Sequence, residues 1–116
     1  MNLNPRRELN DVLVLELRVR KLDGSNAQAF LQAVKSLHLS NQKVVLDLAG
    51  VQFIDSLGLG ALLACLQYLN GIKGQLHLCE LSRTVNKLLE LMRMEHTFQI
   101  HNTCADAVQG FAVLQS

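Results

Sequence analysis

An acid, a hydroxyl and two glycines interrupt an apolar stretch in the middle of the chain, FIDSLGLGALL, which spans residues 53–63. The polar residues are Asp55 and Ser56, and the glycines are Gly58 and Gly60. A buried strand has to turn into a helix here, and Asp or Ser at a helix N-terminus accepts hydrogen bonds from unpaired backbone N–H groups. One interpretation of the segment is therefore a helix cap, with glycines that let the helix pack closely on a sheet.

Four known kinds of catalytic or nucleotide-binding turn fit this segment poorly. A dinucleotide fingerprint needs a third glycine where Leu63 stands, and a P-loop needs a lysine after the glycines. The elbow of a serine hydrolase needs a glycine where Ile54 stands. An aspartyl-phosphate receiver needs further acids after its first strand, where residues 16–20 read ELRVR. We therefore expect that this protein is not an enzyme.

A serine that another protein phosphorylates fits the segment better. A phosphate on Ser56 would lie at the positive end of a helix, where backbone donors and the helix dipole favour it by roughly 0.3–1 kcal/mol. It would also add about two negative charges beside Asp55, at the edge of an apolar helix face. A partner docked on that face would be repelled and would have to desolvate the charge. The segment then predicts a switch for binding.

The other reactive side chains show no spacing typical of a metal or redox site. Each cysteine has apolar neighbours in the sequence, so we expect reduced, buried thiols in a cytosolic protein. We expect no bound metal and no cofactor. The residues considered are Cys65, Cys79, Cys104, His38, His77, His96 and His101.

Length and charge restrict the classes of function. The 116 residues fit one domain, 1–116, and the formal net charge of +1 creates no long-range field for nucleic acid or an anionic membrane. The N-terminus lacks the apolar stretch of a signal peptide, and no window approaches the length of a membrane-spanning helix. We expect a cytoplasmic protein with no membrane insertion and no nucleic-acid partner.

Strands that alternate with helices are predicted along the chain, which is typical of an α/β layer fold with a largely parallel sheet. The basic run of residues 18–21 alternates like a solvent-facing strand. Ser25 and Gln28 have the form of a capping box, and Asn102 or Thr103 caps the last helix. Short apolar runs predict strands at 12–15, 44–48, 75–79 and 98–100, and helical spacing predicts helices over 27–37, 56–70, 81–92 and 104–111.

The helix predicted to start at Ser56 is apolar around most of its circumference. Gly71 and Gly74 mark its end. Either it is buried on both sides, or one side is an exposed patch for a partner. Its two apolar stripes are Leu59, Leu62, Leu63, Leu66 and Leu69, and Ala61, Ala64, Cys65, Tyr68 and Ile72.

The segment 44–63, VVLDLAGVQFIDSLGLGALL, resembles the signature of STAS domains of the bacterial anti-sigma-factor antagonist type. In that signature a buried strand ending in Asp-Leu precedes Asp-Ser-x-Gly-Leu-Gly, which opens a helix. Residues 22–23, 75–81 and 104–108 fall where the family has its counterparts. The resemblance implies a single-domain α/β fold with a mixed, largely parallel sheet of about five strands and four main helices.

The same resemblance implies a mechanism called partner switching. The unphosphorylated antagonist binds an anti-sigma factor, itself a serine kinase of the histidine-kinase-like ATPase type, and so frees the sigma factor. That kinase phosphorylates the serine corresponding to Ser56, which ends the binding, and a metal-dependent serine phosphatase restores it. The partner-binding residues implied are Asp23, Ser25, Asp55, Ser56, Leu57, Gly58, Leu59 and Gly60.

Two departures from the family pattern alter the expected surface. Arg20 and Lys21 make the loop near the switch serine more basic, and Leu57 makes the docking face more apolar. Two other functions stay open. One is a non-catalytic STAS scaffold or regulatory subunit of a stress-signalling complex or a lipid-transport ATPase, and the other is a small-ligand or nucleotide sensor that uses the same turn.

Overall fold

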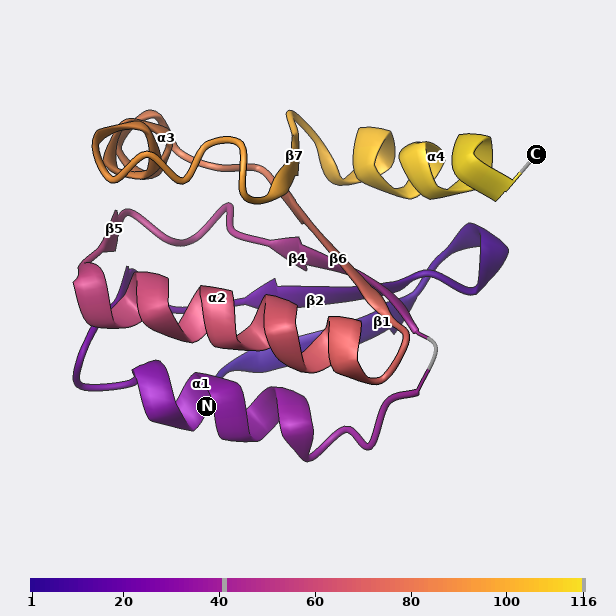
Figure 1. Ribbon diagram of the computed structural model, residues 1–116, viewed down its shortest axis with the longest axis horizontal. Helices are drawn as coiled ribbons and strands as arrows, with labels where there is room; N and C mark the ends of the chain where they lie inside the picture. Colours follow the sequence, from indigo (N-terminus) through magenta and orange to yellow (C-terminus); the bar gives the residue numbers. More distant parts are fainter. Residues whose placement is uncertain (41, 116) are drawn as a thin grey trace.

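The computed structural model describes residues 1–40 and 42–115 and forms one mixed α/β layer structure (Figure 1). Elements alternate between strands and helices as the sequence predicts. In chain order they are β1 (Leu3–Arg7), a 3-10 turn (Leu9–Asp11), β2 (Leu13–Leu17), β3 (Lys21–Leu22), α1 (Ala27–Lys35), β4 (Lys43–Asp47), β5 (Phe53–Ile54), α2 (Ser56–Gly71), β6 (Gln75–Cys79), α3 (Arg83–Leu91), β7 (Gln99–His101) and α4 (Cys104–Gln115).

The main sheet has five strands in the order β1-β2-β4-β6-β7. β1 pairs antiparallel with β2, and the other neighbours pair in parallel. A separate two-stranded sheet pairs β3 with β5, also in parallel. The expected mixed, largely parallel sheet of five strands with four main helices is therefore confirmed for the part of the chain that the structure describes.

Helices cover both faces of the main sheet, so the strands carry apolar residues on both faces. On one face the alternate residues Leu13, Leu15 and Leu17 join the large core under α1 and α2. On the other face Val12 and Val14 join a smaller core under α4. Figure 1 shows α1 and α2 on one side of the strands and α4 on the other.

Strand β1 was not predicted, because its sequence, LNPRR, is short, polar and contains a proline. Pro5 has no N–H to donate, and an edge strand tolerates this because only one of its sides is paired. β1 occupies such an edge, where Pro5 lies opposite Leu15. This segment therefore forms a strand because it pairs with the buried strand β2.

Two local predictions about helix starts and strands are wrong. Ser25 and Gln28 do not form a capping box: Asn26 is the N-cap of α1 and makes no side-chain cap hydrogen bond. The Ser25 hydroxyl donates instead to the Asp23 carboxylate at 2.5 Å. The basic run at 18–21 is not one strand, since β2 ends at Leu17 and only Lys21 enters β3.

The second apolar stripe of α2 is explained by burial and not by an exposed patch. Ala61 and Cys65 belong to the same buried cluster as Phe30 and Val34 of α1. The helix packs against α1 as well as against the sheet, which requires apolar residues around most of its circumference. Within the described residues, no helix is long and apolar enough to cross a membrane.

The end of α2 lies where Gly71 and Gly74 predict it, but neither glycine adopts a left-handed conformation. Lys73 does so, with φ of 63°. Gly74 is needed for a different reason: a Cβ there would lie 2.8 Å from the backbone oxygen of Gln42. Thr103 caps α4 as one of the two predicted residues, because its hydroxyl accepts from the N–H of Asp106 at 3.0 Å.

Candidate functional site

The turn between β5 and α2 presents a serine on the surface at the first position of a long helix. Asp55 is the N-cap, and its Oδ1 accepts from the N–H of Gly58 at 2.8 Å. Ser56, the next residue, is exposed and begins the helix. Among the described residues, the Ser56 hydroxyl makes no side-chain hydrogen bond that would hold it back from a partner.

Gly58 lets the first turn of α2 lie directly against the chain that leaves β3. A Cβ at this position would lie 2.0 Å from the backbone oxygen of Leu22, far inside van der Waals contact. By contrast, a Cβ on Gly60 would meet nothing within 4 Å. Of the two glycines, only Gly58 is therefore required by packing within this chain, while Gly60 lies open to solvent.

A second loop, at residues 23–26, lies beside the Ser56 turn because β3 and β5 pair side by side. The backbone N–H of Gly24 donates to Oδ2 of Asp55 at 3.4 Å, so both oxygens of this carboxylate are engaged. The hydroxyl and N–H of Ser25 donate to Asp23 and hold the pKa of that carboxyl below its usual value. Residues 31 positions apart in the sequence thus form one continuous surface.

The residues predicted to bind a partner divide into an exposed set and a buried set. Ser25, Ser56 and Gly60 are exposed, and Leu57 keeps 62% of its surface open to solvent. Asp23 and Asp55 are half-buried between the two loops. Gly58 and Leu59 are buried, and Leu59 belongs to the large core. The structure therefore brings all eight predicted residues to one end of the molecule. The exposed ones form its surface, and the buried ones pack beneath that surface.

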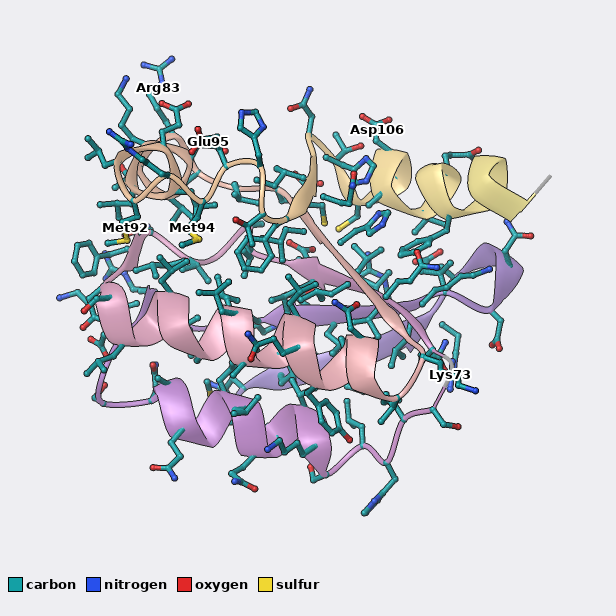
Figure 2. All side chains as sticks on the ribbon, viewed as in Figure 1. Lys73, Arg83, Met92, Met94, Glu95 and Asp106 are labelled. Carbon is teal, nitrogen blue, oxygen red and sulfur yellow. The ribbon has the colours of Figure 1, made fainter. Side chains whose placement is uncertain are left out.

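Apolar and basic side chains border this surface. Phe53 is 41% exposed, although it lies in a strand, and a hollow beside it is lined also by Arg20, Lys21 and Gln52. In Figure 2, Met92 and Met94 point from the end of α3 toward β5 and the start of α2. The basic character that the sequence predicts near Ser56 is thus located next to β5.

The arrangement suits a phosphoacceptor better than a nucleophile. Ser56 lies at the positive end of the helix dipole, which favours an anion there. A serine nucleophile needs a base within hydrogen-bond reach. The two histidines that contact each other, His77 and His101, lie instead under α4, where His77 also stacks on Phe111 with ring centroids 4.0 Å apart.

Away from this turn, the described residues include three side chains of types that can bind metals, which lie together although the sequence does not predict it. Asp47, Cys79 and Cys104 bring a carboxylate oxygen and two sulfurs within 4.8 Å of one another. The strand register brings two of them together. Asp47 and Cys79 are paired residues at the ends of neighbouring parallel strands, and their side chains face α4. The sequence does not reveal this pairing, because 31 residues lie between Asp47 and Cys79.

The chain belongs to the STAS domain family, whose model matches residues 5–107. The family predicted from the Asp-Ser-x-Gly segment is therefore confirmed.

Solved structures of similar fold include both antagonist proteins and part of a transporter. An anti-sigma-factor antagonist domain protein of Planctomyces limnophilus is 21% identical, with a TM-score of 0.79 and coverage of 95% of this chain and 97% of that chain. The anti-sigma factor antagonist SpoIIAA, in its unphosphorylated form, is 17% identical, with a TM-score of 0.71 and coverage of 95% and 96%. The murine anion transporter Slc26a9 is 20% identical, with a TM-score of 0.74, but only 18% of that chain is covered against 89% of this one.

Proposed function

We propose that this protein is an anti-sigma-factor antagonist that works by partner switching. The unphosphorylated form binds an anti-sigma factor, which is also a serine kinase of the histidine-kinase-like ATPase type, and thereby releases a sigma factor. Phosphorylation of Ser56 ends the binding, and a metal-dependent serine phosphatase restores it. Membership of the STAS family supports this proposal, as does the fold shared with two antagonists.

The observation that carries the proposal is the exposed Ser56 beside a carboxylate that is fixed from two sides. Asp55 accepts from Gly58 and from Gly24, so it cannot turn away from the neighbouring serine without losing both bonds. A kinase would meet the serine hydroxyl at the surface. The helix behind it would be disturbed little, because a phosphate at this first helical position lies at the positive end of the helix dipole.

The same geometry explains why a phosphate would end partner binding. Leu57, largely exposed, is the apolar residue that a partner would cover, and it is adjacent to Ser56 in the chain. A phosphate of about two negative charges would have to be desolvated at that contact. A partner surface that fits the unmodified turn would therefore lose its apolar contact with Leu57.

The first test is the modification itself. The protein is purified from its native cells during growth and during stress, and its intact mass is measured with and without treatment by a metal-dependent serine phosphatase. We expect one removable phosphate, which peptide mapping places on Ser56. A Ser56 that carries no phosphate under any of these conditions would contradict the proposal.

The alternative function is a non-catalytic STAS scaffold or a regulatory subunit of a larger complex. The fold shared with a segment of an anion transporter supports it, since this fold also serves as one part of a membrane protein. The Ser56→Ala variant separates the two functions. A scaffold subunit would co-purify with its complex regardless of the serine, whereas an antagonist would exchange partners as the serine is modified.

A further inference from the structure

Two cysteines far apart in the sequence lie in direct contact beneath α4. The sulfurs of Cys79 and Cys104 are 2.6 Å apart, and both thiols are free. Cys79 is the last residue of β6, and Cys104 is the first residue of α4. The third cysteine, Cys65, lies on α2 in the core on the opposite face of the sheet and does not take part.

The backbone around the pair fixes both cysteines in place. Cys79 is held in the sheet by its parallel neighbours, with Asp47 on one side and His101 on the other. The N–H of Cys104 donates to Oε2 of Glu80 at 3.0 Å. Glu80 adopts a left-handed conformation, with φ of 60°, directly after the end of β6. The residue that follows one cysteine thus binds the backbone of the other.

The distance between the sulfurs favours a sulfur–sulfur bond over a shared metal ion. Two thiolates on one tetrahedral zinc, each about 2.3 Å from the metal, lie roughly 3.8 Å apart. The observed 2.6 Å is too short for that arrangement. A disulfide bond is about 2.05 Å long, so a movement of roughly 0.5 Å closes it. The nearby carboxylate of Asp47 makes the cluster resemble a metal site, but the sulfur geometry does not.

Within the described residues, solvent reaches the pair through Cys104. Cys104 is partly exposed and lines a surface hollow together with Arg6, Glu8 and Val108. Cys79 is fully buried. A small oxidant would therefore meet Cys104 first, and Cys79 would act second from within the protein.

We propose that Cys79 and Cys104 are an oxidisable pair that forms an intramolecular disulfide by exchange with a low-molecular-weight disulfide such as oxidised glutathione. In the first step the Cys104 thiolate, its proton lost to solvent, attacks one sulfur of glutathione disulfide and releases one glutathione thiolate. In the second step Cys79 loses its proton, and its thiolate attacks the Cys104 sulfur and releases the second glutathione thiolate. The two released glutathione thiolates take up two protons, which balance the two protons that the cysteines lose. Two protein thiols are oxidised, and one glutathione disulfide is reduced to two thiols.

The rate of this exchange should rise steeply with pH. Burial raises the pKa of the Cys104 thiol to about 11, and burial also raises the pKa of Cys79. Only the thiolate attacks, so the rate should increase about tenfold per pH unit between pH 7 and pH 9. The charged or titratable groups around Cys104, from the elements packed against it, are Arg6, Glu8, Asp47, Cys79 and Glu80.

The test uses the full chain, purified under reducing conditions and then incubated with oxidised glutathione at pH 7, 8 and 9. Thiols left over are alkylated in denaturant, and intact mass and peptide mapping follow. We expect the loss of two hydrogens, a single alkylated thiol at Cys65, and a peptide that links Cys79 to Cys104. The link closes a loop that includes α3 and β7, so the midpoint of thermal unfolding should rise by roughly 10 °C.

Three variants provide the controls. Cys65→Ser should oxidise like the wild type, and Cys104→Ser should lose the link. Cys79→Ala should stop at the mixed disulfide of Cys104 with glutathione. Disulfide-linked dimers, a mixed disulfide that persists at Cys104 in the wild-type protein, or three alkylated thiols at pH 9 would overturn the proposal. Zinc retained stoichiometrically by protein purified without chelators and released only on loss of both thiols would overturn it as well.

Discussion

The two glycines of the Ser56 turn have different roles, although the sequence presents them as equivalent. Gly58 touches the backbone of Leu22, and the position of Gly60 is open. Backbone atoms in a paired strand cannot move aside as the tip of a flexible side chain can. The conformational freedom of glycine is not the reason, since no glycine in the described part of the chain has a positive φ.

We predict that Gly58→Ala destabilises the protein by roughly 2–4 kcal/mol, because the new methyl group must displace the β3 backbone or the start of α2. The matched variant Gly60→Ala should stabilise it by about 0.5–1 kcal/mol, because alanine favours a helix interior and finds open space. Urea unfolding of both variants measures the difference. Equal stabilities would contradict the close approach of Gly58 to Leu22.

At the same turn, charge is predicted to decide partner binding. Ser56→Ala should bind the anti-sigma kinase and stay bound, whereas Ser56→Asp should bind at least tenfold more weakly, because only aspartate approximates the added charge. The partner captured by the Ser56→Ala variant is identified and purified, and its dissociation constants for wild type and both variants are compared at one salt concentration. Equal affinity of the two variants would exclude an electrostatic switch.

At the scale of elements, α4 covers a face of the sheet that differs from the face under α1 and α2. The latter is built from aliphatic residues, while the face under α4 carries His77, Cys79 and Asp47 at alternate or paired positions. His77 lies between His101 and Phe111, with its Nδ1 3.0 Å from Nε2 of His101. A buried imidazole in this setting resists protonation.

Stability should therefore fall as the pH is lowered through the range set by His77. Burial, followed by the neighbouring His101, lowers the pKa of His77 from 6.5 to about 4. The unfolded chain binds a proton near pH 6.5 and the folded chain only near pH 4, so protons favour unfolding between these values. The contribution of neutral His77 to the free energy of unfolding is fully present above pH 6.5, and roughly 3 kcal/mol of it is lost on reaching pH 4.

The variant His77→Phe keeps an aromatic ring against Phe111 and cannot titrate. We expect the difference in unfolding free energy between pH 7 and pH 4 to be smaller by roughly 3 kcal/mol in this variant than in the wild type. Urea unfolding at several pH values gives this difference. His96→Gln is the control, because the side chain of His96 is 95% exposed, and it should follow the wild type. A wild-type pH dependence in His77→Phe would contradict the role of His77.

At the scale of the whole molecule, we expect the proposed switch to act on binding and to leave the fold unchanged. Ser56 lies at the surface, outside both cores. We predict that Ser56→Asp changes the midpoint of thermal unfolding by less than about 3 °C, because aspartate in the first turn of a helix is favourable. Calorimetry measures the midpoint. A fall of about 10 °C or more would mean that charge at Ser56 unfolds the turn itself.

The sequence by itself determined the family, the order of the long elements and the position of the candidate phosphoacceptor. Helices and strands with a clear apolar period were predicted within a few residues, because burial imposes that period on the sequence. The cap of α2 was predicted because it is a local feature: Asp55 and Gly58 interact within one helical turn.

Only the tertiary structure decided the features that depend on partners distant in the chain. Strand β1 exists because β2 pairs with it, and the loop at 23–26 reaches the Ser56 turn because β3 pairs with β5. The contact of Cys79 with Cys104 likewise depends on how α4 returns across the sheet. Contacts of this kind leave no periodic signal in the sequence, because strand pairing and helix packing bring together residues at no fixed spacing.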